Sequence, residues 1–128
     1  MANYLSGFSG FSVTDQKAAQ DFYSTILGLE VKDTGMGLQL LLPGGGKVFI
    51  YEKPDHAPAS FTILNLVVED IDATVDELGA KGVMFEHYDM PGIKQDEKGV
   101  ARGKAVNMGP DIAWFKDPAD NIVAVLSN

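Results

Sequence analysis

WFKDPADNIVAVL, the stretch from Trp114 to Leu126, decides the fold of this chain. An apolar start is followed by the polar sequence DPADN and then by a second apolar run, IVAVL. Pro118 fixes φ at the second position of a turn, and Asp117 can accept hydrogen bonds from the turn's amides. We therefore predict a hairpin between two strands. Because the second strand is apolar at every position, we expect both of its faces to be covered.

The composition limits what the protein can do. Its length of 128 residues predicts one domain, 1–128. The net charge is −8, with 18 acidic and 10 basic residues, so the overall field disfavours nucleic acid and anionic membranes as partners. Cysteine is absent, which excludes thiol catalysis, disulfides and thiolate metal sites. The sequence lacks a visible secretory leader and any apolar run of membrane length, so we expect a cytoplasmic protein.

The first half of the chain predicts one strand, one helix and three more strands. We expect the first strand at residues 8–13. Thr14 or Asp15 begins the helix, and Gly28 ends it. The further strands are expected at residues 29–32, 38–42 and 47–52.

The same order recurs in the second half, because the sequence around Asp70 matches that around Asp15. We expect a strand at residues 61–68, a helix that begins after Asp70 and ends at Gly82, a strand at 83–86, and the closing hairpin. This repetition indicates an internal duplication.

The duplication predicts an α+β fold of two tandem βαβββ modules, at approximately residues 5–54 and 59–128. Their strands would form a mixed, mostly antiparallel curved sheet around a cavity, with the helices outside. One face of the last strand, which carries Ala124, would then look into that cavity.

Residues 87–111 have no counterpart in the first half and are rich in glycine and charge. A connection of this length is often a functional lid or a partner-binding loop. A mobile, solvated loop, or a short hairpin around residues 100–108, is an equally good interpretation of the sequence.

The chain resembles the vicinal oxygen chelate superfamily, which holds glyoxalase I, bleomycin-resistance proteins and extradiol dioxygenases. The resemblance covers nearly the whole chain, and its motifs are typical of the superfamily rather than of one activity within it. The segments that carry it are Phe11–Asp15, Ala19–Leu29, Val67–Ala73 and Phe115–Asn121. The resemblance implies the fold predicted above. It also implies a homodimer, because members commonly complete or flank their cavities across a dimer.

Metal-using members place ligands at inward-facing positions of the first, fifth and last strands, and glyoxalase-type members add a glutamate on the fourth. Carried over through the motifs, these positions are Phe8, Ile63, Ala124 and Ile50. All four residues are apolar, whereas the metals concerned need oxygen or imidazole donors. We therefore expect no metal and no cofactor at the family's usual site.

Alternation along the strands predicts further residues on the cavity face, among them Glu52, Phe61 and Asn65. A carboxylate beside an apolar cavity is suited to act as a general base, but we favour Glu52 as a solvated residue at the end of its strand. Asn65 lies within an apolar strand, where its amide needs hydrogen-bond partners or a ligand. Of Trp114 and Phe115, one must face the cavity, and we assign Trp114 the role of stacking on a planar ligand.

Three hypotheses follow for the function, and we rank binding first. The protein binds a small apolar or aromatic molecule in a metal-free cavity, or it is a metal-independent isomerase or lyase with Glu52 as catalytic base. The third hypothesis is a divalent-metal lyase or dioxygenase with relocated ligands such as Glu52 and His56. The predicted ligand-binding residues are Phe8, Ile50, Glu52, Phe61, Ile63, Asn65, Trp114 and Ala124.

Overall fold

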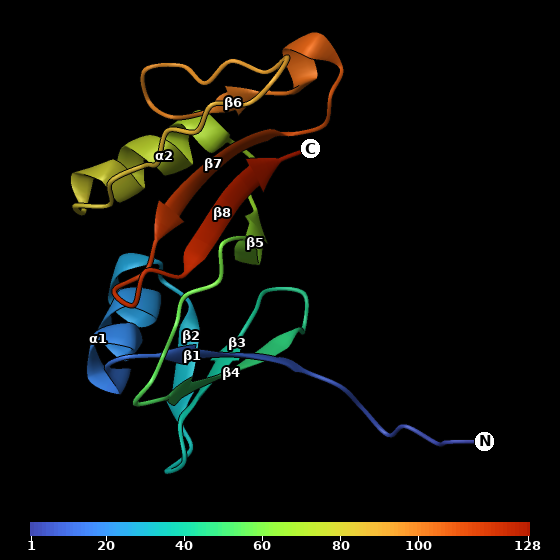
Figure 1. The fold of residues 1–128 in the computed structure, drawn as a ribbon, viewed down its shortest axis with the longest axis vertical. Helices are drawn as coiled ribbons and strands as arrows, with labels where there is room; N and C mark the ends of the chain where they lie inside the picture. Colours follow the sequence, from blue (N-terminus) through green and yellow to red (C-terminus); the bar gives the residue numbers. More distant parts are fainter. The chain divides into compact units, whose positions relative to one another are not determined.

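The computed structural model describes all 128 residues, which form two compact units, residues 1–58 and 59–128 (Figure 1). Each unit contains a four-stranded sheet, with strand order β1-β4-β3-β2 in the first and β5-β8-β7-β6 in the second. In each sheet the strands that come first and last in the sequence, β1 with β4 and β5 with β8, pair in parallel. The other neighbouring strands are antiparallel. The identical order confirms the predicted α+β fold of two tandem βαβββ modules.

The first module begins its helix where the sequence predicts. Asp15 has an extended backbone, and its carboxylate accepts a hydrogen bond from the amide of Ala18 at 3.2 Å, which satisfies a donor at the helix start. The helix ends before Gly28, whose φ of 71° favours glycine. The elements are β1 (Ser9–Val13), α1 (Gln16–Asp21), a π-helical segment (Phe22–Ile26), β2 (Glu30–Asp33), β3 (Leu38–Leu41) and β4 (Lys47–Glu52).

The core of the first module lies on one face of its sheet. Phe11 of β1 contacts Tyr23 of the helical segment, with ring centroids 5.8 Å apart. Tyr23 is completely buried, as is Ile50 of β4. Ile50 lies beside Phe11 in the β1–β4 register, so these side chains share the helix-covered face.

In the second module, Asp70 begins α2 and accepts a hydrogen bond from the amide of Ala73 at 3.1 Å. The helix buries Ile71, Val75 and Leu78 and contacts β7 and β8. The elements are β5 (Thr62–Val67), α2 (Ile71–Ala80), β6 (Ala101–Arg102), a 3₁₀ turn (Lys104–Val106), β7 (Asp111–Lys116) and β8 (Ile122–Ser127). No helix is long and apolar enough to cross a membrane.

The predicted strand at residues 83–86 is wrong. This segment contacts the sheet through an isolated bridge between Phe85 and Phe115 and through a hydrogen bond from the amide of Glu86 to the carbonyl of Trp114, at 2.8 Å. The edge of the sheet is taken instead by β6, which pairs with the start of β7. β6 and β7 form a hairpin whose second strand begins at Asp111, beyond the residues 100–108 in which the sequence suggested a short hairpin.

The closing hairpin depends on the buried carboxylate of Asp117, which is 3% exposed. It accepts hydrogen bonds from the amides of Ala119 (2.8 Å) and Asn121 (2.9 Å) and from the side-chain amide of Asn121 (3.0 Å). The turn is completed by Asp120, whose φ is 64°. The carboxylate thus satisfies donors that water cannot reach.

We predict that Asp117→Ala destabilises the protein by about 3 kcal/mol, because it leaves buried amide donors unsatisfied. Urea unfolding measures the effect. Asp120→Gly is the matched control within the same turn, since glycine adopts positive φ without strain, and it should change stability by less than about 1 kcal/mol. Equal effects of the two substitutions would contradict this role of Asp117.

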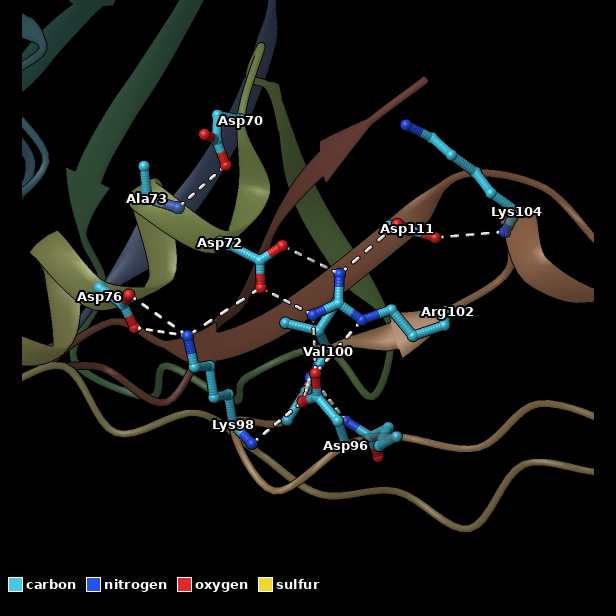
Figure 2. Close-up of polar contacts among 12 residues, drawn as sticks. Asp70, Asp72, Ala73, Asp76, Asp96, Lys98, Val100, Arg102, Lys104 and Asp111 are labelled. Carbon is cyan, nitrogen blue, oxygen red and sulfur yellow. Dashed lines mark hydrogen bonds and ion pairs between the residues drawn. The ribbon is translucent and has the colours of Figure 1, made fainter.

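The connection between α2 and β7 is held on the helix by Arg102, the only arginine of the chain (Figure 2). Its guanidinium donates to both carboxylate oxygens of Asp72, at 2.7 and 3.2 Å. It also donates twice to Asp96, at 2.7 and 3.2 Å, and lies 3.6 Å from the carboxylate of Asp111. We call Arg102, Asp72, Asp96 and Asp111 the arginine clamp.

The clamp lowers the pKa values of two of its carboxylates, Asp72 and Asp96. The hydrogen bond from Arg102 holds the pKa of Asp72 below its usual value. Burial acts to raise the pKa of Asp96, but the backbone amide of Val100 and the guanidinium outweigh it and leave that pKa lowered. Carboxylates with a lowered folded-state pKa contribute stability that is complete above the unfolded pKa, about 4, and is lost as the pH falls through the folded value.

We predict that Arg102→Met raises amide hydrogen exchange in residues 94–102 roughly tenfold at neutral pH, because charge-assisted bonds to two carboxylates are lost. After correction for intrinsic exchange rates, the wild-type protection of this segment should also decrease below about pH 4, while the variant should lack that pH dependence. Lys98→Met is the control, since Lys98 pairs with the more exposed Asp76 at 3.0 Å and should contribute little.

Candidate ligand-binding site

The sheet face of the second module that α2 does not cover carries a row of three predicted site residues. The strand register places Ala124 of β8 between Asn65 of β5 and Trp114 of β7. Paired residues of neighbouring strands point to the same face, so the three side chains lie side by side. The register therefore puts Trp114, rather than Phe115, on the face of Ala124. Phe115 is fully buried on the opposite face.

This row offers a ligand distinct kinds of contact. Asn65 is exposed, so its amide is solvated and does not need the buried partner that its apolar strand suggested. Ala124 is fully buried, with a side chain of only one carbon, and forms the floor of the row. Trp114 is half-buried and presents an aromatic surface at the end of the row that lies on β7.

Tyr88 completes the row, although the sequence did not point to it. Its ring contacts Trp114 edge-on, with centroids 5.5 Å apart and an interplanar angle of 68°. Burial raises the pKa of the Tyr88 phenol, and the carboxylate of Glu86 raises it further. Tyr88 lies in a segment without strand periodicity, so only the tertiary structure could show its contact with Trp114.

The uncovered sheet face of the first module has an aromatic pair of its own. The β1–β4 register places Tyr51 beside Ser12 and Phe49 beside Gly10. The rings of Phe49 and Tyr51 are stacked, with centroids 5.8 Å apart. The hydroxyl of Ser12 is hydrogen-bonded to Nδ1 of His56 at 2.6 Å. Of these side chains, only that of His56 entered a hypothesis drawn from the sequence, as a relocated metal ligand.

Two predicted residues lie on the other face, and their assignment to the cavity face is wrong. Ile50 shares the helix-covered face with Phe11, and Glu52 lies beside Val13 on that same face. The carboxylate of Glu52 accepts a hydrogen bond from the amide of Gln16 at 3.0 Å, at the start of α1. The prediction failed because the parallel pairing of β1 with β4, rather than residue counting, decides which side chains face outward.

The remaining predicted residues lie at the beginnings of strands. Phe8 precedes β1 and is 72% exposed, and Phe61 precedes β5 and is 66% exposed. Ile63 lies at the register shift between Thr62 and Leu64. The participation of Phe8, Phe61 and Ile63 in a common ligand site stays a prediction.

The sequence profile of the Glyoxalase/Bleomycin resistance protein/Dioxygenase superfamily matches residues 8–124. The chain belongs to this superfamily. The match extends over both modules and includes the whole row of Asn65, Ala124, Trp114 and Tyr88.

Solved structures with the same fold include several members of the superfamily. An antibiotic-binding protein from Streptomyces sp. CB03234, TnmS3, is 24% identical with a TM-score of 0.64, and the alignment covers 98% of each chain. A glyoxalase family protein from Bacillus anthracis is 20% identical with a TM-score of 0.64, over 100% of this chain and 99% of the other. The fosfomycin resistance protein FosX from Listeria monocytogenes is 14% identical with a TM-score of 0.67, over 100% and 95%. No curated protein matches the chain significantly.

The residues at the positions that the resemblance assigns to metal ligands do not fit a metal. Phe8, Ile63 and Ala124 offer only hydrocarbon, and on β4 the outward-facing alternatives to Ile50 are aromatic. No group of three or more histidine, aspartate or glutamate side chains is gathered where it could hold an ion. Because a divalent ion needs several oxygen or imidazole donors, we derive no chemistry through a metal.

We predict that Tyr88→Ala shifts the fluorescence of Trp114, the only tryptophan, to longer wavelength, because the indole loses an edge-on neighbour and becomes more hydrated. The aromatic contact is expected to contribute about 1 kcal/mol to stability. Met84→Ala is the control, since Met84 is 83% exposed. An unchanged emission spectrum in Tyr88→Ala would contradict the contact.

Proposed function

We propose that the protein binds a small, flat aromatic molecule reversibly, without chemical conversion, on the uncovered face of the β5-β8-β7 sheet. The observation that carries this proposal is the row of Asn65, Ala124 and Trp114, extended by Tyr88, on a sheet face that has no helix over it. TnmS3 is an antibiotic-binding protein, which supports a small-molecule ligand for this chain as well.

Each residue of the row has a defined role in the proposed complex. The indole of Trp114 stacks on the ligand ring, and Tyr88 holds the indole in place from its edge. The amide of Asn65 donates to and accepts from polar groups at the ligand's rim. Ala124 is fully buried, so its single carbon does not reach the ligand, whereas a larger side chain there would project into the space that the ring takes.

The proposal predicts that planar aromatic compounds raise the melting temperature and quench Trp114. For a compound found in this way, Trp114→Leu should weaken binding at least tenfold, because stacking contributes about 1–1.5 kcal/mol beyond area burial. Asn65→Ala should weaken it about fivefold through a lost hydrogen bond, and Ala124→Phe should abolish it by occupying the site. Because Trp114→Leu removes the reporter, calorimetry is the readout for that variant.

Met84→Ala is the control for all three variants. If no compound in a broad aromatic library raises the melting temperature, reversible binding is refuted. If the three substitutions leave the affinity unchanged, the ligand lies elsewhere on the protein.

The competing hypothesis is a metal-independent isomerase or lyase with Glu52 as general base. The hydrogen bond from the amide of Gln16 to Glu52 supports a structural role for this carboxylate at the beginning of α1 instead. Glu52→Gln keeps an oxygen that can accept this bond. Any turnover found for an aromatic ligand should therefore persist in Glu52→Gln, and its loss would restore the enzymatic hypothesis.

We propose that binding is independent of metal. Glu52 and His56, considered above as relocated ligands, contact the amide of Gln16 and the hydroxyl of Ser12 respectively. Protein purified without chelator or added metal should contain substoichiometric manganese, nickel, zinc and iron. The melting temperature should not change with EDTA or with any of these ions, and a stoichiometric ion would overturn the proposal.

We also propose that the protein is a homodimer, as the superfamily resemblance implies. Its first residues support this, because Tyr4, Leu5 and Phe8 are 88%, 94% and 72% exposed, and neighbouring exposed apolar side chains mark interaction surfaces. Sedimentation should give a dimer, and Leu5→Glu should weaken it. A monomeric wild type would refute the proposal. The cytoplasmic location expected from the sequence stays a prediction.

A further inference from the structure

An open hollow of about 1110 Å³ lies along the segment between α2 and the 3₁₀ turn. This volume is of the size that drug-like ligands occupy in proteins. None of the individually predicted site residues lines it, but all of its lining residues belong to residues 87–111, which the sequence marked as a possible functional loop. The lining residues are His87, Tyr88, Asp89, Met90, Gly92, Ile93, Lys94, Gln95, Asp96, Arg102, Ala105 and Val106.

The hollow is held in shape by hydrogen bonds that do not involve a ligand. The side-chain amide of Gln95 donates to the carbonyls of Glu86 (3.0 Å) and Gly99 (2.6 Å), and its oxygen accepts from the amide of Tyr88. The arginine clamp attaches two further lining residues, Asp96 and Arg102, to α2 (Figure 2). A ligand entering a pre-formed hollow has less ordering cost to overcome.

The lining favours an uncharged molecule. Its surface is mostly apolar, through side chains such as Met90, Ile93 and Val106. The charges balance, with Asp89 and Asp96 against Lys94 and Arg102, so the hollow itself has no preference for either sign. The net charge of −8 adds a field that disfavours anions.

We propose that this hollow is a second subsite for the same ligand, and that it takes the uncharged, apolar part of a multi-ring molecule that extends past Trp114. Tyr88 connects the two subsites, because it lines the hollow and contacts Trp114. The inference rests on the proposed function and deepens it: the ligand is a large neutral ring system rather than a single ring or an organic anion.

Nile red, a neutral flat dye, tests the proposal, with its own emission and the quenching of Trp114 as readouts. Two variants, Ile93→Asp and Val106→Asp, each place a charge on the apolar wall of the hollow. Because Val106 is 49% exposed, the Val106→Asp variant should fold normally. Each substitution should weaken dye binding about tenfold, since a charge is placed against an apolar ring. Met84→Asp, which adds the same charge outside the hollow, should bind normally. The anionic dye anilinonaphthalene sulfonate should bind wild type more weakly than Nile red.

The outcomes separate this inference from the proposed function. If binding depends on Asn65 and Ala124 but not on Ile93 or Val106, the hollow is not a ligand subsite, whereas the proposed site on the sheet face is still supported. Equal weakening by Met84→Asp means nonspecific adsorption, and tighter binding of the anionic dye is also incompatible with the proposal. Failure of every aromatic compound to bind wild type refutes the proposed function itself.

Discussion

The parallel pairing of the first and last strands of each module is the constraint on which the rest of the structure depends. It aligns Ser9–Val13 with β4 in one sheet and β5 with β8 in the other. Once that register is set, alternation decides which side chains meet a helix and which remain uncovered. The row of Asn65, Ala124 and Trp114 exists because β8 lies between β5 and β7.

Features that depend on local chemistry could be predicted from the sequence. Asp15 and Asp70 begin the helices, Gly28 ends the first one, and the Asp117 turn forms where its residues indicate. The order of elements followed from the recurrence of these signals. The bounds of β4, Lys47–Glu52, are those expected.

Features that depend on distant partners could not be predicted in the same way. Ile50 and Glu52 were placed on the wrong face because their orientation is set by β1, which lies at the other end of the module's sequence. Residues 83–86 are apolar enough for a strand, but they meet β7 only through the bridge at Phe115, while β6 pairs with the beginning of β7. Residues 87–111 stood out in the sequence as a possible functional loop, but they have neither strand nor helix periodicity, so the position of Tyr88 and of the hollow within them could not be predicted.

The pairing that closes each sheet also has a consequence for how the modules form. Contact between β1 and β4 closes the chain from Ser9 to Val48, whereas contact between β5 and β8 closes the longer stretch from Thr62 to Ile122. The longer closure costs only about 0.4 kcal/mol more chain entropy. Non-local pairing nonetheless slows folding, so the second module, which carries the proposed site, is the one whose sheet should close last. The segment that supplies the extra length is the one along which the hollow lies.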